Sequence, residues 1–349
     1  MGTISVLGAG SWGTALAMVL ADNGHAVRLW ARRKEQIEEI NQRHTNESYL
    51  PGVTLSETIV GCASMEQAVE DTDAILLVVP TKAMRETVAE LRKVLKKKVV
   101  MIHASKGIEP GTHKRISEMI EEEMGGTELL EAVVVLSGPS HAEEVSQRQP
   151  TTVTVSSKCH QAAEFAQDLF MNQRFRVYTN PDLIGVEIGG ALKNIIALVC
   201  GLTQGLGMGD NPKAAIMTRG LAEIARLGVK LGANPLTFAG LSGLGDLIVT
   251  CTSIHSRNFR AGKLIGEGKT LDEVLDSMGM VVEGIQTTKA THELAVECGV
   301  DMPITASLHA VLFDGVQPKD AAEGLMGRVK KHEVEQLHTD IVDAAYRQS

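Results

Sequence analysis

The chain has 349 residues, of which 44% are hydrophobic and 22% are charged, and its formal net charge is −9. This length suits about two domains with well-buried cores, and the composition argues against intrinsic disorder. The acidic balance argues against a general nucleic-acid binder, because such proteins are usually basic.

The cysteines and the apolar segments restrict the class of protein further. Five cysteines are scattered along the chain and form no C-x-x-C pair, and the histidines show no metal-ligand spacing. We therefore expect neither a disulfide framework nor a metal site. There is no signal-type segment at the start and no stretch of about 18 apolar residues free of charge. We expect a cytoplasmic protein without a membrane span.

The first thirty residues predict a dinucleotide-binding unit. An apolar strand, a glycine-rich turn, a helix and a second strand follow one another over 3–30. The turn reads Gly8-Ala9-Gly10-Ser11-Trp12-Gly13, which is the G-x-G-x-x-G spacing. Gly8 permits a tight turn, Gly10 lets the backbone approach a pyrophosphate, and Gly13 lets the helix pack against the strand. The free N–H groups at the start of the helix then face an anion.

The end of the second strand bears on the choice of dinucleotide. NAD-preferring folds place an Asp or Glu on the ribose 2′-hydroxyl, whereas this chain continues Trp30-Ala31-Arg32-Arg33 and has no carboxylate before Glu35. Arginine can clamp a 2′-phosphate that an acid would repel. We therefore expect NADP(H) to be preferred, with NAD(H) as the alternative. The two arginines also fit an ordinary solvated turn.

The rest of the first half alternates strands and helices. Continuous apolar runs are typical of parallel strands that are buried on both faces. We expect strands over 3–7, 26–30, 74–79, 99–102, 133–136, 151–155 and 175–178, and helices over 82–96 and 114–124. The pattern indicates an α/β fold with a doubly wound, Rossmann-type sheet.

After residue 180 the sequence predicts helices almost alone. Thr179-Asn180-Pro181-Asp182 is typical of a helix start with Pro in the first turn, and Asp210-Asn211-Pro212 begins another helix. Further helices are expected over 271–278, 284–298 and 305–313. We therefore divide the chain into an NAD(P)-binding domain, residues 1–180, and an all-helical substrate and catalytic domain, residues 181–349.

The helix after Pro181 carries a lysine in an otherwise small and apolar stretch. Gly189 and Gly190 precede Lys193 by one turn, and a glycine within a helix costs about 1 kcal/mol relative to alanine. We expect the glycines to leave open space beside the lysine, which a ligand could fill. Desolvation disfavours the ammonium form, so that Lys193 becomes a competent proton donor or acceptor. The alternative is a snorkelling lysine on a helix that packs closely through its glycines.

Polar residues also follow two predicted strands at their carboxyl ends, where open parallel sheets bind ligands. Lys106 follows the strand over 99–102, and Gly138-Pro139-Ser140 follows the strand over 133–136. Ordinary strand-to-helix turns would use the same glycine and proline residues.

Two segments of the helical half carry further candidate binding groups. Asp246 is a lone carboxylate after three small residues, and its burial would require a partner such as a lysine or a substrate hydroxyl. A helix cap is the alternative role. Ser256-Arg257-Asn258 offers a hydroxyl, a guanidinium and an amide to the oxygens of a phosphate monoester. Such a tripeptide is also common on protein surfaces.

In this order, and over nearly the whole chain, the segments resemble the bacterial-type NAD(P)-dependent sn-glycerol-3-phosphate dehydrogenases. The resemblance rests on the glycine-rich turn with Thr14-Ala15-Leu16-Ala17 and on Asn46-Glu47-Ser48-Tyr49-Leu50-Pro51-Gly52, Ser105-Lys106-Gly107-Ile108, Ser137-Gly138-Pro139-Ser140-His141-Ala142, Ala191-Leu192-Lys193-Asn194, Gly245-Asp246-Leu247, Ser256-Arg257-Asn258 and Glu283-Gly284. It implies interconversion of dihydroxyacetone phosphate and sn-glycerol 3-phosphate with NAD(P)H, supplying glycerophospholipid biosynthesis. It also implies a homodimer.

The resemblance further implies residue roles. Catalysis falls to Lys193 as the general acid or base, together with Lys106 and Asp246. The expected substrate site comprises Lys106, Gly138, Ser140, Lys193, Asp246, Ser256, Arg257 and Asn258. The expected cofactor site comprises Gly8, Gly10, Ser11, Trp12, Gly13, Arg32, Arg33, Tyr49, Lys106, Ala142, Arg257, Val281 and Glu283.

Two other functions stay open from the residues alone. Another two-domain reductase with a helical second domain and a catalytic lysine, such as a β-hydroxyacid or 6-phosphogluconate dehydrogenase, would act on carboxylate substrates. A non-catalytic redox sensor would bind NAD(P) without oxidising it. The two lysines, Asp246 and the Ser-Arg-Asn triplet argue against a sensor.

Overall fold

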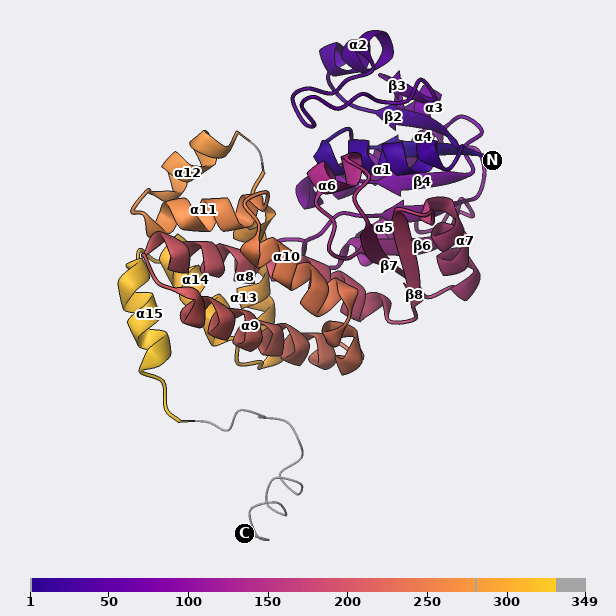
Figure 1. Ribbon diagram of the computed structural model, residues 1–349. Helices are drawn as coiled ribbons and strands as arrows, with labels where there is room; N and C mark the ends of the chain where they lie inside the picture. The colour runs from indigo at the N-terminus through magenta and orange to yellow at the C-terminus, as the bar shows by residue number, and fades with distance from the viewer. Residues whose placement is uncertain (1, 280, 331–349) are drawn as a thin grey trace.

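The computed structural model describes residues 2–279 and 281–330, which form a sheet-based region and a helical region side by side (Figure 1). Within this part of the chain the sheet has eight strands in the order β3-β2-β1-β4-β5-β6-β7-β8. Neighbouring strands are parallel except for the antiparallel pair of β6 and β7. The strands are β1 (Thr3–Leu7), β2 (Ala26–Trp30), β3 (Ile59–Cys62), β4 (Ala74–Leu77), β5 (Val99–His103), β6 (Leu130–Ser137), β7 (Thr151–Ser157) and β8 (Phe175–Asn180).

The seven predicted strands are confirmed, with ends that differ by a few residues, whereas β3 is missed. β3 has only four residues and contains Gly61, and glycine weakens a strand pattern. The side chain of Asn41, on the preceding helix, accepts a hydrogen bond from Gly61 N at 2.7 Å and donates to Gly61 O at 3.0 Å. A contact between positions twenty residues apart therefore supports this strand, and no local pattern reveals it.

Helices cover both faces of the sheet, as expected for a doubly wound fold. They are α1 (Ser11–Asp22), α2 (Lys34–Arg43), α3 (Met65–Val69), α4 (Met84–Val94), α5 (Ile116–Glu123), α6 (Ala142–Ser146) and α7 (His160–Phe170). Successive strand residues serve opposite faces. Val6 and Leu76 join the core under α1, α2, α6 and α7, and Leu7 and Leu77 join the core under α3, α4 and α5.

The described residues after β8 form helices and helical turns alone, and residues 331–349 of the expected second domain lie outside them. The helices are α8 (Leu183–Gly205), α9 (Asp210–Lys230), α10 (Asp246–Thr252), α11 (Arg257–Gly266), α12 (Leu271–Met278), α13 (Glu283–Cys298), α14 (Pro303–Phe313) and α15 (Pro318–Met326). The Asp182 carboxylate caps α8 by accepting from Gly185 N at 2.9 Å. Pro181 precedes this cap, so its expected place in the first turn is wrong.

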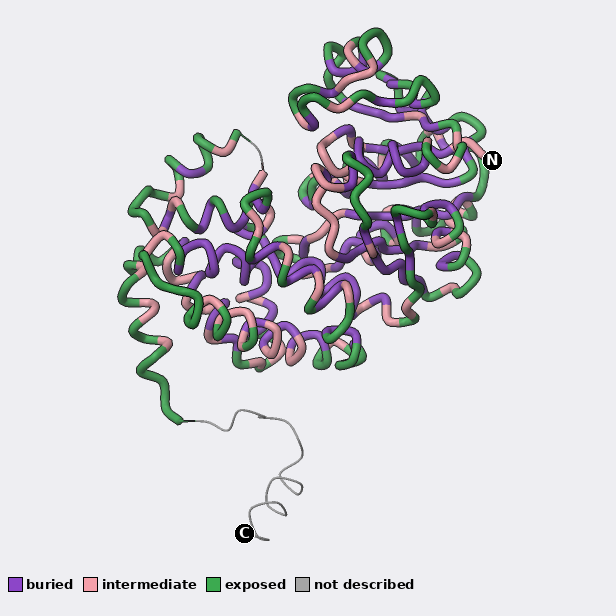
Figure 2. Tube along the Cα trace, viewed as in Figure 1, coloured by how far each residue is buried: buried purple, intermediate pink, exposed green. Residues whose placement is uncertain are grey.

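α8 is the central helix of this region and is buried along most of its length (Figure 2). It packs against α9, α10, α11 and α13. Among the described helices, α8 alone is long and apolar enough to cross a membrane, but 94% of its apolar stretch is buried inside the protein. Its composition is accordingly that of a core helix.

α8 and α11 approach each other through paired glycines. A Cβ on Gly201 or Gly205 would overlap carbonyl oxygens of α11, and a Cβ on Gly262 or Gly266 would overlap carbonyl oxygens of α8. The two backbones are thus in direct contact along more than one turn. Since α8 carries Lys193 and α11 begins at Arg257, this packing also sets the relative position of two predicted site segments.

Candidate active site

A buried cluster of three charged side chains lies where the two regions meet. Lys193 of α8 and Lys106, which follows β5, both donate to the carboxylate of Asp246 at the start of α10. Lys193 Nζ binds Asp246 Oδ1, and Lys106 Nζ lies 2.6 Å from Asp246 Oδ2. The side chain of Asp246 is 1% exposed and that of Lys193 is 8% exposed, whereas Lys106 is 19% exposed and closes the open side. The structure therefore brings all three predicted catalytic residues together.

A tight turn aims Asp246 at Lys193. Residues Leu241–Gly245 form a π-helical turn that leads into α10, and such turns are frequent at functional sites. A Cβ at Gly243 would overlap the backbone of Phe238, so only glycine fits this turn. Asp246 is the first residue of α10 and continues the helical backbone of the π-helical turn without a break.

The glycines before Lys193 do not leave the expected open space. A Cβ on Gly189 would come within 2.7 Å of the Ser242 carbonyl oxygen, and a Cβ on Gly190 would come within 2.7 Å of Ser137 Oγ. Protein fills the space on both sides, because the π-helical turn and the end of β6 pack directly against α8. The expectation of a ligand-sized gap there is wrong. The glycines serve instead to let the π-helical turn and the end of β6 pack against α8 close to Lys193.

Burial and neighbouring charges tune the cluster. Burial lowers the pKa of Lys193 from its ordinary value to about 7, Asp246 opposes this shift and Lys106 adds to it. Burial alone would raise the pKa of Asp246, but the two ammonium groups hold it below its usual range. A lysine whose pKa is near neutrality can exchange a proton with a substrate at physiological pH. The cluster therefore holds a fixed carboxylate and a titratable ammonium.

Thr250 completes the surroundings of Lys193, and the sequence analysis missed it. Lys193 Nζ donates to Thr250 Oγ1 at 2.7 Å, and this hydroxyl donates to the backbone oxygen of Asp246 at 2.6 Å. Thr250 lies four residues after Asp246, on the same face of α10. That spacing is the signal that would have identified it.

Ser256, Arg257 and Asn258 have unequal surroundings. The Ser256 hydroxyl caps α11 by accepting from Phe259 N at 3.2 Å. Both ends of the Asn258 amide are bound, since it donates to Asn194 at 2.9 Å and accepts from Gly284 N at 2.9 Å. Arg257 is exposed and donates to Val281 O at 3.3 Å. Of the triplet, Arg257 is therefore the member placed on the surface.

Gly138 and Ser140 lie beside Lys106 at the end of β6. Lys106 Nζ reaches Gly138 O at 3.5 Å, and Ser140 Oγ donates to the same oxygen at 2.9 Å. Gly138 has φ +146°, and a Cβ there would come within 2.9 Å of Val153 Cα. Backbone geometry and close packing both require glycine at this position.

The glycine-rich turn has the geometry that a pyrophosphate needs. Gly8 has φ +119°, and a Cβ on Gly13 would overlap the Gly8 carbonyl, whereas a Cβ on Gly10 would meet nothing within 4 Å. Gly10 thus faces open space at the start of α1, whose first turn has neither a side-chain cap nor an acidic residue. Trp12 Nε1 is buried without a hydrogen-bond partner. The turn fits the phosphates of a dinucleotide.

The other predicted cofactor residues fall into two groups. At the end of β2, Arg32 pairs with Glu86 at 2.9 Å, and the Arg33 guanidinium lies 5.4 Å from the centre of the Tyr49 ring. The Tyr49 carbonyl also accepts from Ser11 Oγ at 2.8 Å.

The second group lies nearer the helical region. Glu283, the first residue of α13, accepts from Thr81 N at 3.3 Å and so joins the two regions. Its burial raises its pKa. Val281 accepts from Arg257, and Ala142 is the buried first residue of α6.

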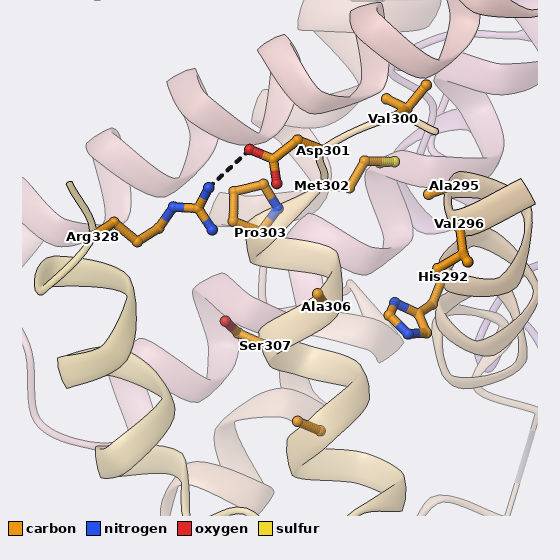
Figure 3. Close-up of a pocket in the computed structure, with 11 residues that line it drawn as sticks. His292, Ala295, Val296, Val300, Asp301, Met302, Pro303, Ala306, Ser307 and Arg328 are labelled. Carbon is orange, nitrogen blue, oxygen red and sulfur yellow. Dashed lines mark hydrogen bonds and ion pairs between the residues drawn. The ribbon is translucent and has the colours of Figure 1, made fainter. Parts of the chain in front are cut away.

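A pocket lies within the helical region, between α13 and α14 (Figure 3). Its volume is about 400 Å³, and it is lined by α13, α14 and Arg328, whose guanidinium pairs with Asp301 at 2.8 Å. No predicted site residue lines this pocket among the described residues. The buried cluster at the junction of the two regions is thus the better candidate for the active site.

Comparison with known proteins identifies relatives over nearly the whole chain. The family model described as NAD-dependent glycerol-3-phosphate dehydrogenase N-terminus matches residues 3–163, and the corresponding C-terminus model matches residues 182–323. A protein from Shouchella clausii named glycerol-3-phosphate dehydrogenase (NAD(P)+) is 68% identical over 338 residues, which cover 97% of this chain and 99% of the relative. A protein of the same name from Halalkalibacterium halodurans is 69% identical over 343 residues, 98% of this chain and 99% of its own.

Solved structures agree with this assignment. A crystal structure of glycerol-3-phosphate dehydrogenase from Coxiella burnetii has a TM-score of 0.89 at 38% identity and covers 94% of this chain and 99% of its own. A ketopantoate reductase from Ralstonia eutropha has a TM-score of 0.57 at 14% identity, which shows a shared fold alone. The chain belongs to the NAD-dependent glycerol-3-phosphate dehydrogenase family.

Proposed function

We propose that this chain interconverts dihydroxyacetone phosphate and sn-glycerol 3-phosphate with NAD(P)H, and that Lys193 is its general acid and base. The observation that carries the proposed role is the buried cluster in which Asp246 holds Lys193 while the pKa of this lysine is lowered to about 7. Family membership supports the substrate class.

The contacts of Lys193 fix the orientation of its ammonium group. An ammonium group has three donors, and two of them are directed at Asp246 and Thr250. The third is available to a substrate oxygen. Bound NAD(P)H supplies a hydride to the carbonyl carbon of dihydroxyacetone phosphate. As negative charge develops on the carbonyl oxygen, Lys193 stabilises it and donates its proton; in the reverse direction the neutral amine takes the hydroxyl proton.

Asp246 and Lys106 hold this geometry. The carboxylate binds both ammonium groups, so that it orients Lys193 and fixes Lys106 at the more exposed side of the cluster. Lys106 contributes a second positive charge next to the site of the developing oxyanion. It also extends from the sheet region, which supports its proposed contact with both substrate and cofactor.

The phosphate of the substrate is assigned to the groups around the cluster. We place it against Arg257, with Gly138, Ser140, Ser256 and Asn258 shaping the site. Asn258 binds Asn194, the neighbour of Lys193, which supports a position for the triplet close to the reacting carbon. Binding energy from a phosphate remote from the reacting carbon serves to position the carbonyl.

The cofactor is assigned to the sheet region. The pyrophosphate would lie on Gly8, Gly10 and Gly13 at the start of α1, with Ser11, Trp12, Ala142, Val281 and Glu283 around it. We propose that NADP(H) is preferred over NAD(H), because Arg32 and Arg33 end β2 and no carboxylate precedes Glu35. In the structure Arg32 pairs with Glu86 across an exposed gap, so that a 2′-phosphate would compete with this carboxylate.

Substitution of Lys193 tests the proposed function. We expect Lys193→Ala to lose about 10²- to 10⁴-fold in turnover, the usual contribution of general acid catalysis. NADPH binding, measured by its fluorescence, should be largely kept, and Lys230→Ala, an exposed lysine at the end of α9, serves as the control. Near-normal turnover of Lys193→Ala would remove the lysine from its role. If the unmodified protein turned over 3-hydroxy acids but not dihydroxyacetone phosphate, the proposed substrate would be wrong.

The organisation of the whole protein follows from the same assignment. We propose an NAD(P)-binding domain over residues 1–180 and a substrate domain over 181–349, and a cytoplasmic homodimer. Light scattering coupled to gel filtration would measure the oligomeric state directly.

A further inference from the structure

A second buried polar cluster lies next to the active site, and the proposed chemistry does not use it. Its centre is the carboxylate of Glu187 on α8, whose side chain is 4% exposed. Arg115 and Ser117, at the start of α5, and His103, at the end of β5, surround it. It combines residues from three elements of both regions.

Both oxygens of the carboxylate are engaged. Glu187 Oε2 accepts from Arg115 Nη1 at 2.5 Å and from Ser117 Oγ at 2.6 Å. Glu187 Oε1 accepts from Ser117 N at 2.8 Å, and His103 Nε2 lies 3.2 Å from it. Burial alone would raise the pKa of Glu187, but His103, Arg115 and Ser117 hold it below its ordinary value. The cluster therefore contains a fixed negative charge.

The partners of Glu187 lie at both ends of the segment that carries Lys106. His103 and Arg115 flank the connection 104–114, which carries Lys106. Glu187 lies six residues before Lys193 on the same helix, which is fewer than two turns. Glu187 accordingly joins both ends of the segment that carries Lys106 to the helix that carries Lys193.

We infer that Glu187 is a positioning residue for the reaction, which holds the Lys106 segment against α8 so that both lysines meet Asp246. The inference rests on the proposed roles of Lys193, Lys106 and Asp246. No contact of Glu187 with either lysine is among those described, so it acts through Arg115, Ser117 and His103. Misplacement of a catalytic group by about 1 Å can cost about 100-fold in rate. Loss of the contacts through which Glu187 holds the Lys106 segment should therefore have a measurable effect on turnover.

A purely structural anchor predicts different behaviour, and Glu223 provides the matched control. Glu223 of α9 is a buried carboxylate that accepts from Ile304 N at 2.6 Å and from Thr305 N at 3.2 Å. It caps α14 and contacts no residue of the lysine cluster among its described partners. Glu187→Gln and Glu223→Gln each remove one buried carboxylate and keep the shape of the side chain.

The test compares these two variants with the unmodified protein in three measurements: melting temperature, kcat for dihydroxyacetone phosphate, and the pH dependence of kcat. Both variants are expected to melt at lower temperature. Glu187→Gln should also lose about 10- to 100-fold in kcat. Since Lys106 lowers the pKa of Lys193, a displaced Lys106 should move the alkaline fall of kcat to higher pH. Glu223→Gln should change neither kcat nor this profile.

Two outcomes are decisive. If Glu187→Gln melts early but keeps its kcat and its pH profile, as expected of Glu223→Gln, Glu187 is an anchor and the inference is wrong. If Glu187→Gln does not fold, Ser117→Ala removes one hydrogen bond to the carboxylate and should show the same changes at smaller size. The proposed function is judged separately, because Lys193→Ala with normal turnover would contradict it whatever Glu187→Gln does.

Discussion

The sheet region and the helical region present their predicted functional groups in different ways. The predicted pyrophosphate site of the sheet region consists of backbone N–H groups and the open side of Gly10, all within one six-residue turn. The predicted proton-transfer site consists of side chains: Lys193 and Asp246 lie 53 positions apart on helices of the other region, and Lys106 comes from the sheet region. The residues of the predicted pyrophosphate site are thus adjacent in the sequence, whereas the residues of the proposed proton-transfer site come together only when the chain folds.

The two regions also differ in how they hold charge. The start of α1 has no acidic residue and no side-chain cap, so its attraction for an anion comes from peptide dipoles. The cluster at the junction buries two ammonium groups and one carboxylate, of which Lys193 titrates near neutrality. A single substitution should therefore have a large effect on turnover in the lysine cluster, and a moderate effect on kinetics at the expected cofactor residues that end β2.

After Lys193→Ala, Asp246→Asn should have the largest effect on turnover. It leaves two buried ammonium groups without their shared carboxylate, so that Lys193 loses both its orientation and the charge that supports its protonated form. We expect kcat for dihydroxyacetone phosphate to fall by about 10³-fold, within the range of general acid catalysis. NADPH affinity should change much less than kcat, since the glycine-rich turn is in the other region and Lys106 is the one expected cofactor residue among the described partners of Asp246.

Asp272→Asn is the matched control for this prediction. Asp272 also lies in the first turn of a helix, α12, but it is exposed. It should keep full turnover. If Asp246→Asn weakened NADPH binding as strongly as it lowered kcat, the functional separation of the two regions would be wrong.

The sequence predicted the sheet region well because its signals are local. Apolar runs identified β1 and β2, and glycine spacing identified the turn between them. β3 could not be found, because a hydrogen-bonded pair between Gly61 and the distant Asn41 supports it. The reversed direction of β7 likewise depends on pairing with β6 and not on the residues of either strand.

The buried cluster of Lys193, Lys106 and Asp246 was predicted for reasons that were only partly right. A lysine in an apolar stretch indicated desolvation, and the burial of Lys193 confirms it. The adjacent glycines indicated a gap, yet they admit the backbone of Ser242 and the Ser137 side chain. A sequence shows that one face of a helix carries small residues. It does not show whether a ligand or another part of the protein packs against that face.

The pH dependence of kcat should differ in sign between the two directions of the reaction. In the proposed mechanism reduction needs the ammonium form of Lys193, so kcat should be constant below about pH 7 and fall above it, by up to about tenfold per pH unit. Oxidation needs the neutral amine, so its kcat should rise over the same range. Measuring both directions at saturating substrate checks the sign. Parallel profiles in the two directions would exclude Lys193 as the shared acid and base.

Arg32→Ala should change the choice of cofactor and nothing else. Losing a charged hydrogen bond to the 2′-phosphate should lower kcat/KM with NADPH by about 10- to 100-fold, and leave NADH nearly unaffected. Arg43→Ala, an exposed arginine in the last turn of α2, is the control for net charge. Glu86→Gln should raise the NADPH preference, because Arg32 then loses its competing partner. A preference of the unmodified protein for NADH would contradict the assignment of Arg32.

Gly262→Ala should have the smallest effect on chemistry while reducing the stability of the helical region. A methyl group there would overlap the Leu198 carbonyl, so α8 and α11 would have to separate. Overpacking of this kind costs about 1–3 kcal/mol, which for a protein of this size lowers the melting temperature by roughly 1–4 °C. Gly324→Ala is the matched control, since a Cβ at this position in α15 meets nothing within 4 Å and alanine favours the helix. Because α8 carries Lys193, any loss of kcat in Gly262→Ala should accompany the loss of stability, and NADPH affinity should be unchanged. An equal change in melting temperature for the two variants would show that the close contact of α8 and α11 contributes nothing to stability.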